Sequence, residues 1–138
     1  MLPHLIKGNS FIDERGTLQF NYDFNALGIK RLYTIQNRDT SFVRGWQGHK
    51  IEQRWFLVLQ GSFKIILVAI DDWVSPSLNL DQHHFILNSQ NMDVLHVPSG
   101  YVSSIQGLEP FSKLLLMSDY LLGEINDEYR FDLDYFIK

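Results

Sequence analysis

The sequence is dominated by short runs of β-branched and aromatic residues, which turn residues separate at intervals of about 8–12 positions. Examples are IKRLYTIQ, RWFLVLQ, SFKIILVAI, HHFILN, DVLHVP and SKLLLMS. Gly61 splits two of these runs, and this pattern predicts a hairpin with a tight connection. Many short strands with little helix predict an all-β fold, a sandwich or barrel, and we expect a jelly roll first among these.

Residues 63–70 are apolar at nearly every position, which predicts a strand that is covered on both of its faces. If the chain contains a helix, we expect a short one within GEINDEYRFDLDYFIK, residues 123–138, although the periodicity of that segment is poor. The sequence has 138 residues and shows no internal repeat or linker. We therefore predict one domain, residues 1–138, with its own hydrophobic core.

Several classes of protein are disfavoured by composition. The chain has no cysteine, so it has neither disulfides nor thiolate sites, and this suits a cytoplasmic location. The start MLPHLIKGNS lacks the apolar core of a signal peptide, and no run approaches the roughly 18 apolar residues of a spanning helix. The net charge is −4 with dispersed positive charges, so we predict neither membrane nor nucleic-acid binding.

Six motifs occur in an order that resembles a known family: DERGTLQF, IKRLY, RGWQGHK, QGSFKI, VPSGYVSS and MSDYL. Residues 11–135 resemble small cupins that act on nucleotide-linked sugars, the dTDP-4-keto-6-deoxyhexose 3,5-epimerases and the dTDP-sugar 3,4-ketoisomerases. RGWQGHK and the chain length resemble the ketoisomerases, whereas GYVSSIQGLEP resembles the epimerases. The resemblance implies a double-stranded β-helix (a cupin jelly-roll barrel) with its ligand inside, and a homodimer that exchanges N-terminal strands.

Many cupins hold a metal ion, and the resemblance places their ligand positions at Gln47, His49, Gln53 and Ser103. Of these four, only the His49 imidazole is a ligand that transition metals prefer, because amides and hydroxyls are weak donors. Glu52 is beside the carboxylate position, and strand alternation predicts that it faces the opposite side. We therefore predict neither a metal nor another cofactor, and we assign Ser103 to substrate binding.

The family reactions remove a proton from a carbon next to a ketone, which requires a base and a hydrogen-bond donor for the enolate oxygen. His49 matches the second histidine of the ketoisomerases and is the candidate base. Gln47 stands where the first histidine would be, and Leu115 matches the position of the epimerase tyrosine. Because both epimerase catalysts are missing, we expect ketoisomerase chemistry, with Gln47 or Tyr33 polarising an oxygen.

Three arginines are candidates for binding the nucleotide-sugar, because guanidinium makes paired, charge-assisted bonds to a diphosphate. Arg44 begins the RG motif, and Arg54 stands where the epimerases have a lysine. Arg15 matches an arginine that contacts ligand from across the dimer in the resembling family. The alternatives are an exposed Arg54 paired with Glu52, and an Arg15 that only occupies a surface turn.

The remaining histidines are interpreted as structural. His83 and His84 are adjacent on a strand and point to opposite faces, so they do not chelate one ion easily. His96 lies in an apolar run and is expected to be a hydrogen-bonded core residue. The acidic tail NDEYRFDLDYF is interpreted as a solvated face or a dimer edge.

Three functions stay open from the sequence. The first is a metal-independent sugar isomerase, most similar to a 3,4-ketoisomerase of cell-surface polysaccharide biosynthesis, with His49 as base. The second is a catalytically degenerate module that binds a nucleotide-sugar without turnover, as the changes at Gln47 and Leu115 suggest. The third is a structural dimer whose cavity is filled by side chains.

Overall fold

The computed structural model describes residues 1–137, which form twelve strands and no helix. The described part of the chain therefore contains no helix that could span a membrane. The strands are β1 (His4–Ile6), β2 (Asn9–Asp13), β3 (Gly16–Phe20), β4 (Arg31–Ile35), β5 (Val43–His49), β6 (Arg54–Gln60), β7 (Ser62–Ala69), β8 (Gln82–Asn88), β9 (Val94–Val97), β10 (Tyr101–Gly107), β11 (Lys113–Ser118) and β12 (Tyr129–Arg130).

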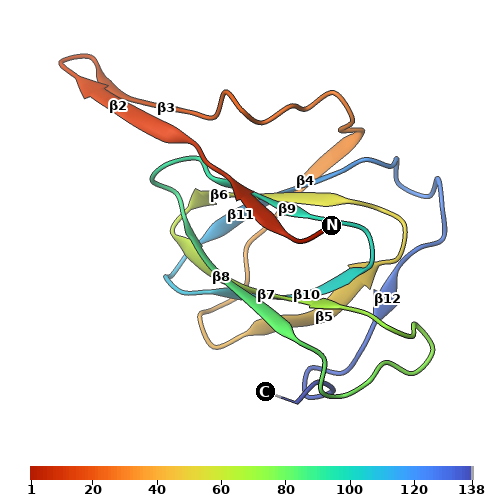
Figure 1. The fold of residues 1–138 in the computed structure, drawn as a ribbon. Helices are drawn as coiled ribbons and strands as arrows, with labels where there is room; N and C mark the ends of the chain where they lie inside the picture. Colours follow the sequence, from red (N-terminus) through yellow and green to blue (C-terminus); the bar gives the residue numbers. More distant parts are fainter. Residues whose placement is uncertain (138) are drawn as a thin grey trace.

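Two five-stranded antiparallel sheets face each other, with the strand orders β1-β9-β6-β11-β4 and β12-β5-β10-β7-β8. This arrangement confirms the predicted all-β jelly roll. The strands β2 and β3 pair with each other in a separate sheet, and Figure 1 shows this hairpin extending away from the barrel. Apolar side chains from both large sheets meet between them, among them Phe56, Phe63, Leu95 and Leu114.

The predicted hairpin of β6 and β7 is wrong, because the two strands belong to different sheets. Gly61 connects them with a positive φ of 73°, and a Cβ atom there would lie 2.2 Å from Ser112 Oγ. The turn signal was therefore correct, but the turn transfers the chain from one sheet to the other instead of returning it along β6. When a strand is apolar on both faces, its sequence does not indicate which neighbouring strand it pairs with.

The prediction that β7 is covered on both faces is confirmed. Phe63, Ile65 and Leu67 are fully buried in the core between the sheets. On the other face of β7, Val68 and Ile66 join a cluster that includes Phe136 from the C-terminal segment. The C-terminal segment therefore covers the outside of the second sheet.

The predicted C-terminal helix is wrong for residues 123–137; Lys138 lies outside the described residues. The backbone of this segment bonds to β5, since Phe131 N–H donates to Trp46 O at 2.9 Å. Its internal bond, from Tyr135 N–H to Asp132 O at 3.0 Å, closes only one turn. Trp46 Nε1 in turn donates to Leu133 O at 3.0 Å, and its ring packs against Phe136. These tertiary contacts outweigh the weak helical periodicity, because helix formation depends on a packed amphipathic face.

Candidate functional site

A cavity of about 650 Å³ lies at one end of the barrel. Its walls come from β4, β5, β6, β10 and β11, and residues 122–128 complete the enclosure. Six of the seven predicted site residues line it: Tyr33, Arg44, Gln47, His49, Arg54 and Ser103. A cavity of this size has room for a ligand of several hundred Å³, so side chains do not fill the interior at this end.

Arg15, the seventh predicted residue, lies outside the cavity of its own chain, on the turn between β2 and β3. Its side chain is 80% exposed and forms an ion pair with Asp13 at 2.6 Å. Because the hairpin extends away from the barrel (Figure 1), Arg15 could reach a cavity only in a partner chain. Its predicted binding role stays a prediction.

His49 ends β5 and is 9% exposed, with its ring at the cavity wall. Its Nδ1 lies 2.9 Å from the backbone oxygen of Asp127. A carbonyl oxygen can only accept a hydrogen bond, so Nδ1 carries the proton. In the neutral ring, Nε2 is then unprotonated and is the nitrogen that can accept a proton from a ligand.

The surroundings of His49 favour its neutral form. Burial lowers the pKa of the His49 imidazole, and the positive charge of Arg54 lowers it further. The carboxylate of Glu52, whose Oε2 is 3.7 Å from Nδ1, opposes this shift, as does the contact with Asp127. With a lowered pKa, the imidazole is unprotonated at neutral pH, which is the state that a base requires.

This lowered pKa gives a prediction for pH dependence. If His49 is a catalytic base, its protonation stops the reaction, and we expect the acid limb of a kcat/KM profile to have its midpoint below the ordinary histidine pKa of about 6.5. The unfolded chain binds this proton more readily, so the unfolding free energy contributed by His49 should decline as pH falls below about 6.5. A kinetic midpoint at or above about 6.5 would contradict the assignment of the base to the buried His49 imidazole.

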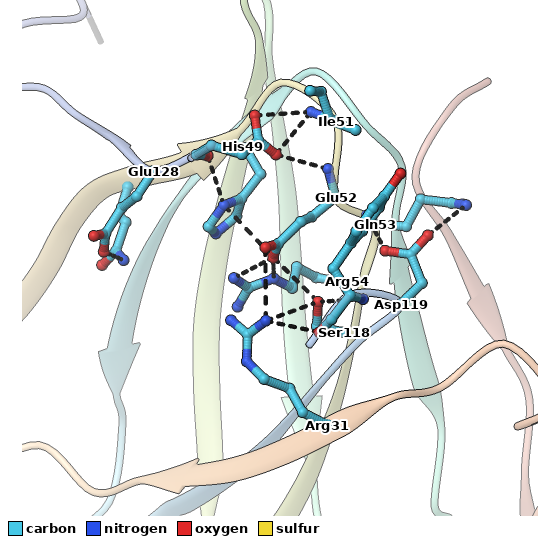
Figure 2. A network of polar contacts seen from close by, with 12 residues as sticks. Arg31, His49, Ile51, Glu52, Gln53, Arg54, Ser118, Asp119 and Glu128 are labelled. Atoms are coloured by element: carbon cyan, nitrogen blue, oxygen red, sulfur yellow. Dashed lines mark hydrogen bonds and ion pairs between the residues drawn. The ribbon is translucent and has the colours of Figure 1, made fainter. Parts of the chain in front are cut away.

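Glu52 lies inside the cavity, which corrects the prediction that it faces away. It belongs to the turn between β5 and β6 and not to a strand, so strand alternation does not apply to it. It is 6% exposed, and its Oε2 accepts bonds from Arg54 Nε at 3.1 Å, Arg54 Nη2 at 2.7 Å and Ser118 Oγ at 3.1 Å. Arg31 Nη1 is 3.6 Å from its other oxygen (Figure 2).

This network fixes the charge state of Glu52, Arg54 and Arg31, which together form what we call the floor of the cavity. Burial raises the pKa of Glu52, but the bonds and charge of Arg54 outweigh burial and hold the pKa below its ordinary value. Arg54 is itself 6% exposed, so its alternative placement as an exposed strand residue is wrong, whereas the expected pairing with Glu52 is present. The floor therefore carries a carboxylate and two guanidinium groups.

Tyr33 is joined to the same network. Arg54 Nη1 donates to the Tyr33 hydroxyl oxygen at 2.6 Å, so the Tyr33 proton is available for another acceptor. Trp55 is next to Arg54 in β6 and faces the other side of the sheet, where it stacks on His96 with ring centroids 5.1 Å apart. The expected alternation of Arg54 and Trp55 is therefore confirmed.

The rim of the cavity is polar as well. The Gln47 amide donates to the Glu128 carboxylate, and Arg130 Nη2 donates to the same oxygen at 3.0 Å. Ser103 is the register partner of Gln47 in β10, with Oγ 3.4 Å from Gln47 O. Arg44 is exposed, and its Nε donates to an asparagine side chain at 3.4 Å.

The structure also places Leu115 on β11 and His96 on β9, two residues for which the sequence leads to expectations. Leu115 faces outward into an apolar cluster, whereas Leu116 lines the cavity, so the position matched to the epimerase tyrosine is one residue out of register. Both residues are aliphatic, and β11 still supplies no phenol to the cavity. His96 is a hydrogen-bonded histidine as expected, with Nε2 2.7 Å from Gln53 Oε1.

The donor set does not fit a metal ion. His49, Glu52 and Asp127 each offer one ligand atom within 4.8 Å of the others. However, both Asp127 oxygens accept backbone N–H bonds, and the Glu52 carboxylate accepts the Arg54 guanidinium. A divalent cation would have to displace these donors and lie beside a buried positive charge. The cavity therefore presents acid–base side chains and not a set of metal ligands.

Comparisons with known proteins identify the family of this chain. Residues 2–138 match the family model described as FdtA: WxcM-like, C-terminal. A search of curated sequences found no match. One similar structure is a histidine-to-asparagine mutant of the 3,4-ketoisomerase QdtA from Thermoanaerobacterium thermosaccharolyticum in complex with TDP-4-keto-6-deoxyglucose, with a TM-score of 0.72 and 25% identity over 94% of this chain and 89% of that chain.

Two further structures share the fold. The TDP-quinovose 3,4-ketoisomerase WlaRB from Campylobacter jejuni has a TM-score of 0.68 and 22% identity, over 93% of this chain and 92% of that chain. The dTDP-4-dehydrorhamnose 3,5-epimerase from Bacillus anthracis has a TM-score of 0.72 and 20% identity, over 91% of this chain and 76% of that chain. Together with the matched family model, these results show that the chain belongs to the FdtA (WxcM-like, C-terminal) family of cupins, whose structural neighbours are dTDP-sugar 3,4-ketoisomerases and 3,5-epimerases.

Proposed function

We propose that the protein is a metal-independent 3,4-ketoisomerase that acts on a dTDP-linked 4-keto-6-deoxyhexose, with His49 as the base. The observation that carries this proposal is a neutral imidazole at the cavity wall, with Nδ1 committed to Asp127 and Nε2 free to accept a proton. The hydroxyl of Tyr33, bonded to Arg54, supplies a donor in the same cavity. We propose that the step occurs in the cytoplasm and serves cell-surface polysaccharide biosynthesis.

The proposed reaction moves two protons and needs no oxidant or reductant. His49 Nε2 takes the proton from C3, and the electrons of that C–H bond form the C3=C4 double bond of an enediolate with its charge on O4. Tyr33 donates a hydrogen bond to O4 and stabilises this charge. The O3 hydroxyl proton then passes to O4, the imidazolium returns its proton to C4, and C3=O forms.

Incubation of the protein with dTDP-4-keto-6-deoxyglucose tests this proposal directly. We expect carbon NMR to show a new 3-keto sugar nucleotide, with the C4 carbonyl signal declining as the C3 carbonyl signal grows. The control is the same incubation with protein heated beyond unfolding. If the sugar stays unchanged while dTDP still raises the melting temperature of the protein, the ketoisomerase proposal fails.

A second candidate function is supported by Gln47. This residue is at the position of the first family histidine, and its amide is held by Glu128 and takes up no proton at neutral pH. A module that binds a nucleotide-sugar without turnover would retain the arginines and the cavity and would need no base. The outcome described above, a thermal shift without conversion, would support this binding module.

Arg44 is the rim residue for which we predict the clearest loss of binding. Arg44→Ala should weaken dTDP binding by about 1.5–3 kcal/mol if Arg44 makes charge-assisted bonds to the diphosphate. Isothermal titration of dTDP measures this directly. Arg38→Ala is the matched control, because Arg38 is an exposed arginine that pairs with Asp39 at 3.7 Å outside the cavity. Equal affinity in the wild type and Arg44→Ala would remove Arg44 from the site.

We also propose that the protein forms a homodimer through its β2–β3 hairpin. Phe11 and Leu18 are register partners in this hairpin, and each is 55% exposed. A second copy that covers these side chains would bring Arg15, at the turn, toward a neighbouring cavity. Analytical ultracentrifugation should show a dimer for the wild type and a monomer for Leu18→Asp. Val74→Asp, at a 93% exposed position elsewhere, should stay dimeric; a monomeric wild type would overturn the proposal.

A further inference from the structure

Asp127 lies in the segment between β11 and β12, which forms one wall of the cavity. It is only 4% exposed, although its neighbours Asn126 and Glu128 are exposed. A carboxylate so deeply buried needs strong hydrogen-bond partners, because burial of an unpaired charge is costly. The partners of Asp127 show what this residue does.

Its carboxylate binds the turn that follows His49. Oδ1 accepts the N–H groups of Lys50 at 2.9 Å and Ile51 at 3.1 Å, while Oδ2 accepts those of Ile51 at 2.9 Å and Glu52 at 2.8 Å. Three consecutive backbone N–H groups therefore converge on one side chain, which is 77 residues away from Lys50 in the chain. In Figure 2, the dashed lines from the N–H groups of Ile51 and Glu52 mark three of these bonds.

The backbone of the same residue binds the His49 ring, because its carbonyl oxygen accepts from Nδ1 at 2.9 Å. Asp127 thus binds two adjacent parts of the chain. Its side chain binds the turn at residues 50–52, and its backbone oxygen binds the imidazole of His49, which directly precedes that turn. The carboxylate bonds fix where the carbonyl lies relative to the ring. Loss of the carboxylate bonds therefore frees the backbone at residue 127, next to the ring, although Tyr129 and Arg130 stay paired with β5.

We infer that Asp127 is a positioning residue, whose carboxylate anchors the C-terminal segment to the turn at residues 50–52 so that its carbonyl keeps the His49 proton on Nδ1 and leaves Nε2 as the base. The inference rests on the proposed function for its catalytic meaning, but the arrangement of the proton on the ring is independent of turnover. The bond made by one ring nitrogen determines the protonation of the other.

Loss of the carboxylate has two consequences. The three N–H groups lose their acceptor, so residue 127 itself is no longer held against the turn, while β12 stays paired with β5. The His49 ring then has no fixed acceptor at Nδ1, and its proton can move to Nε2. A ring protonated on Nε2 cannot take a proton from the sugar with that nitrogen, so the reaction slows even though His49 is present.

Two variants and one matched control test the inference. Asp127→Ala removes all four hydrogen bonds from the N–H groups of residues 50–52. Asp127→Asn keeps one side-chain oxygen, which can still accept some of these bonds. Asp119→Ala is the control, because the Asp119 carboxylate accepts the neighbouring Gln53 N–H at 2.9 Å and thus binds the same connection without contacting His49. Comparison of the variants with this control separates loosening of the connection from loss of the His49 acceptor.

The first readout is the tautomer of His49, measured by long-range nitrogen–proton NMR of protein labelled with ¹⁵N-histidine, without any sugar. We expect the wild type and Asp119→Ala to be protonated on Nδ1, and Asp127→Ala to be protonated partly or mainly on Nε2. The second readout is kcat, which we expect to fall about 10–100-fold in Asp127→Ala, by analogy with the loss of a hydrogen-bond partner that orients a metal-bound histidine. In both readouts, Asp127→Asn should lie between the wild type and Asp127→Ala.

An Nδ1-protonated ring and an unchanged kcat in Asp127→Ala would overturn the inference. If Asp127→Ala does not fold, Asp127→Asn decides by the same two readouts, with no change in either refuting the role. A wild type that lacks turnover but shows the tautomer change in the variants would refute the proposed function and leave the positioning role intact. The two failures are therefore distinguishable.

Discussion

Replacement of His49 with asparagine should lower kcat by about 10²–10⁴-fold, the contribution typical of a positioned general base. Asparagine cannot take a proton at neutral pH, so abstraction from C3 would depend on water. The variant is conservative for the fold, because the asparagine side-chain N–H₂ can replace Nδ1–H as donor to the Asp127 carbonyl, which is 2.9 Å from the ring in the wild type. Initial rates of 3-keto product formation measure the effect.

The control for this variant is ligand binding. Because we assign His49 to proton abstraction and not to contacts with the diphosphate, dTDP should raise the melting temperature of His49→Asn as much as that of the wild type. A variant that binds dTDP normally and turns over within threefold of the wild-type rate would show that another group is the base. Tyr33→Phe, assayed in parallel, tests the donor that we assign to O4.

Replacement of Glu52 with leucine should have the largest effect on stability. It leaves Arg54, which is 6% exposed, without its carboxylate partner, and removes the acceptor of Ser118. A broken buried ion pair costs about 3–5 kcal/mol in a closed core, and we expect about 2–4 kcal/mol here because water in the cavity can reach the arginine. Urea unfolding at a fixed protein concentration measures the difference in unfolding free energy.

The double variant Glu52→Leu with Arg54→Met is the control that identifies the cause. If the destabilisation comes from an uncompensated charge, the removal of that charge should restore most of the lost unfolding free energy. If the double variant is as unstable as the sum of the two single variants, the loss comes from packing at residue 52 and not from charge. Loss of Glu52 alone should lower the pKa of His49 further, because its carboxylate raises that pKa, whereas the added loss of Arg54 removes an effect of opposite sign.

Much of the fold and of the site could be predicted from local patterns in the sequence. The all-β class follows from β-branched runs with turn residues between them, and β7 is covered on both faces as its composition predicts. Within RGWQGHK, the alternation of a strand brings Gln47 and His49 to the same side of β5, and both line the cavity. The alternation of Arg54 and Trp55 was predictable for the same reason.

Long-range contacts were not predictable from these patterns. Glu52 follows the end of β5 by only a few residues, where the chain already turns, so strand alternation does not determine which way its side chain points. Asp127 is in an acidic tail that has the composition of a solvated surface, yet its carboxylate is buried by contacts with residues 50–52. A spacing of more than 70 residues leaves no periodic signal, so only the tertiary structure shows that this tail completes the site.

The most direct test of the account is hydrogen exchange at the sugar in heavy water. Wild-type protein, dTDP-4-keto-6-deoxyglucose and D₂O should give deuterium on the carbons between which the carbonyl moves, at C3 of the remaining substrate or at C4 of the product, because His49 Nε2 exchanges its proton with solvent. His49→Asn should show this incorporation at least about 10²-fold more slowly. Equal incorporation by both proteins, or equal product formation by both, would contradict a base at His49.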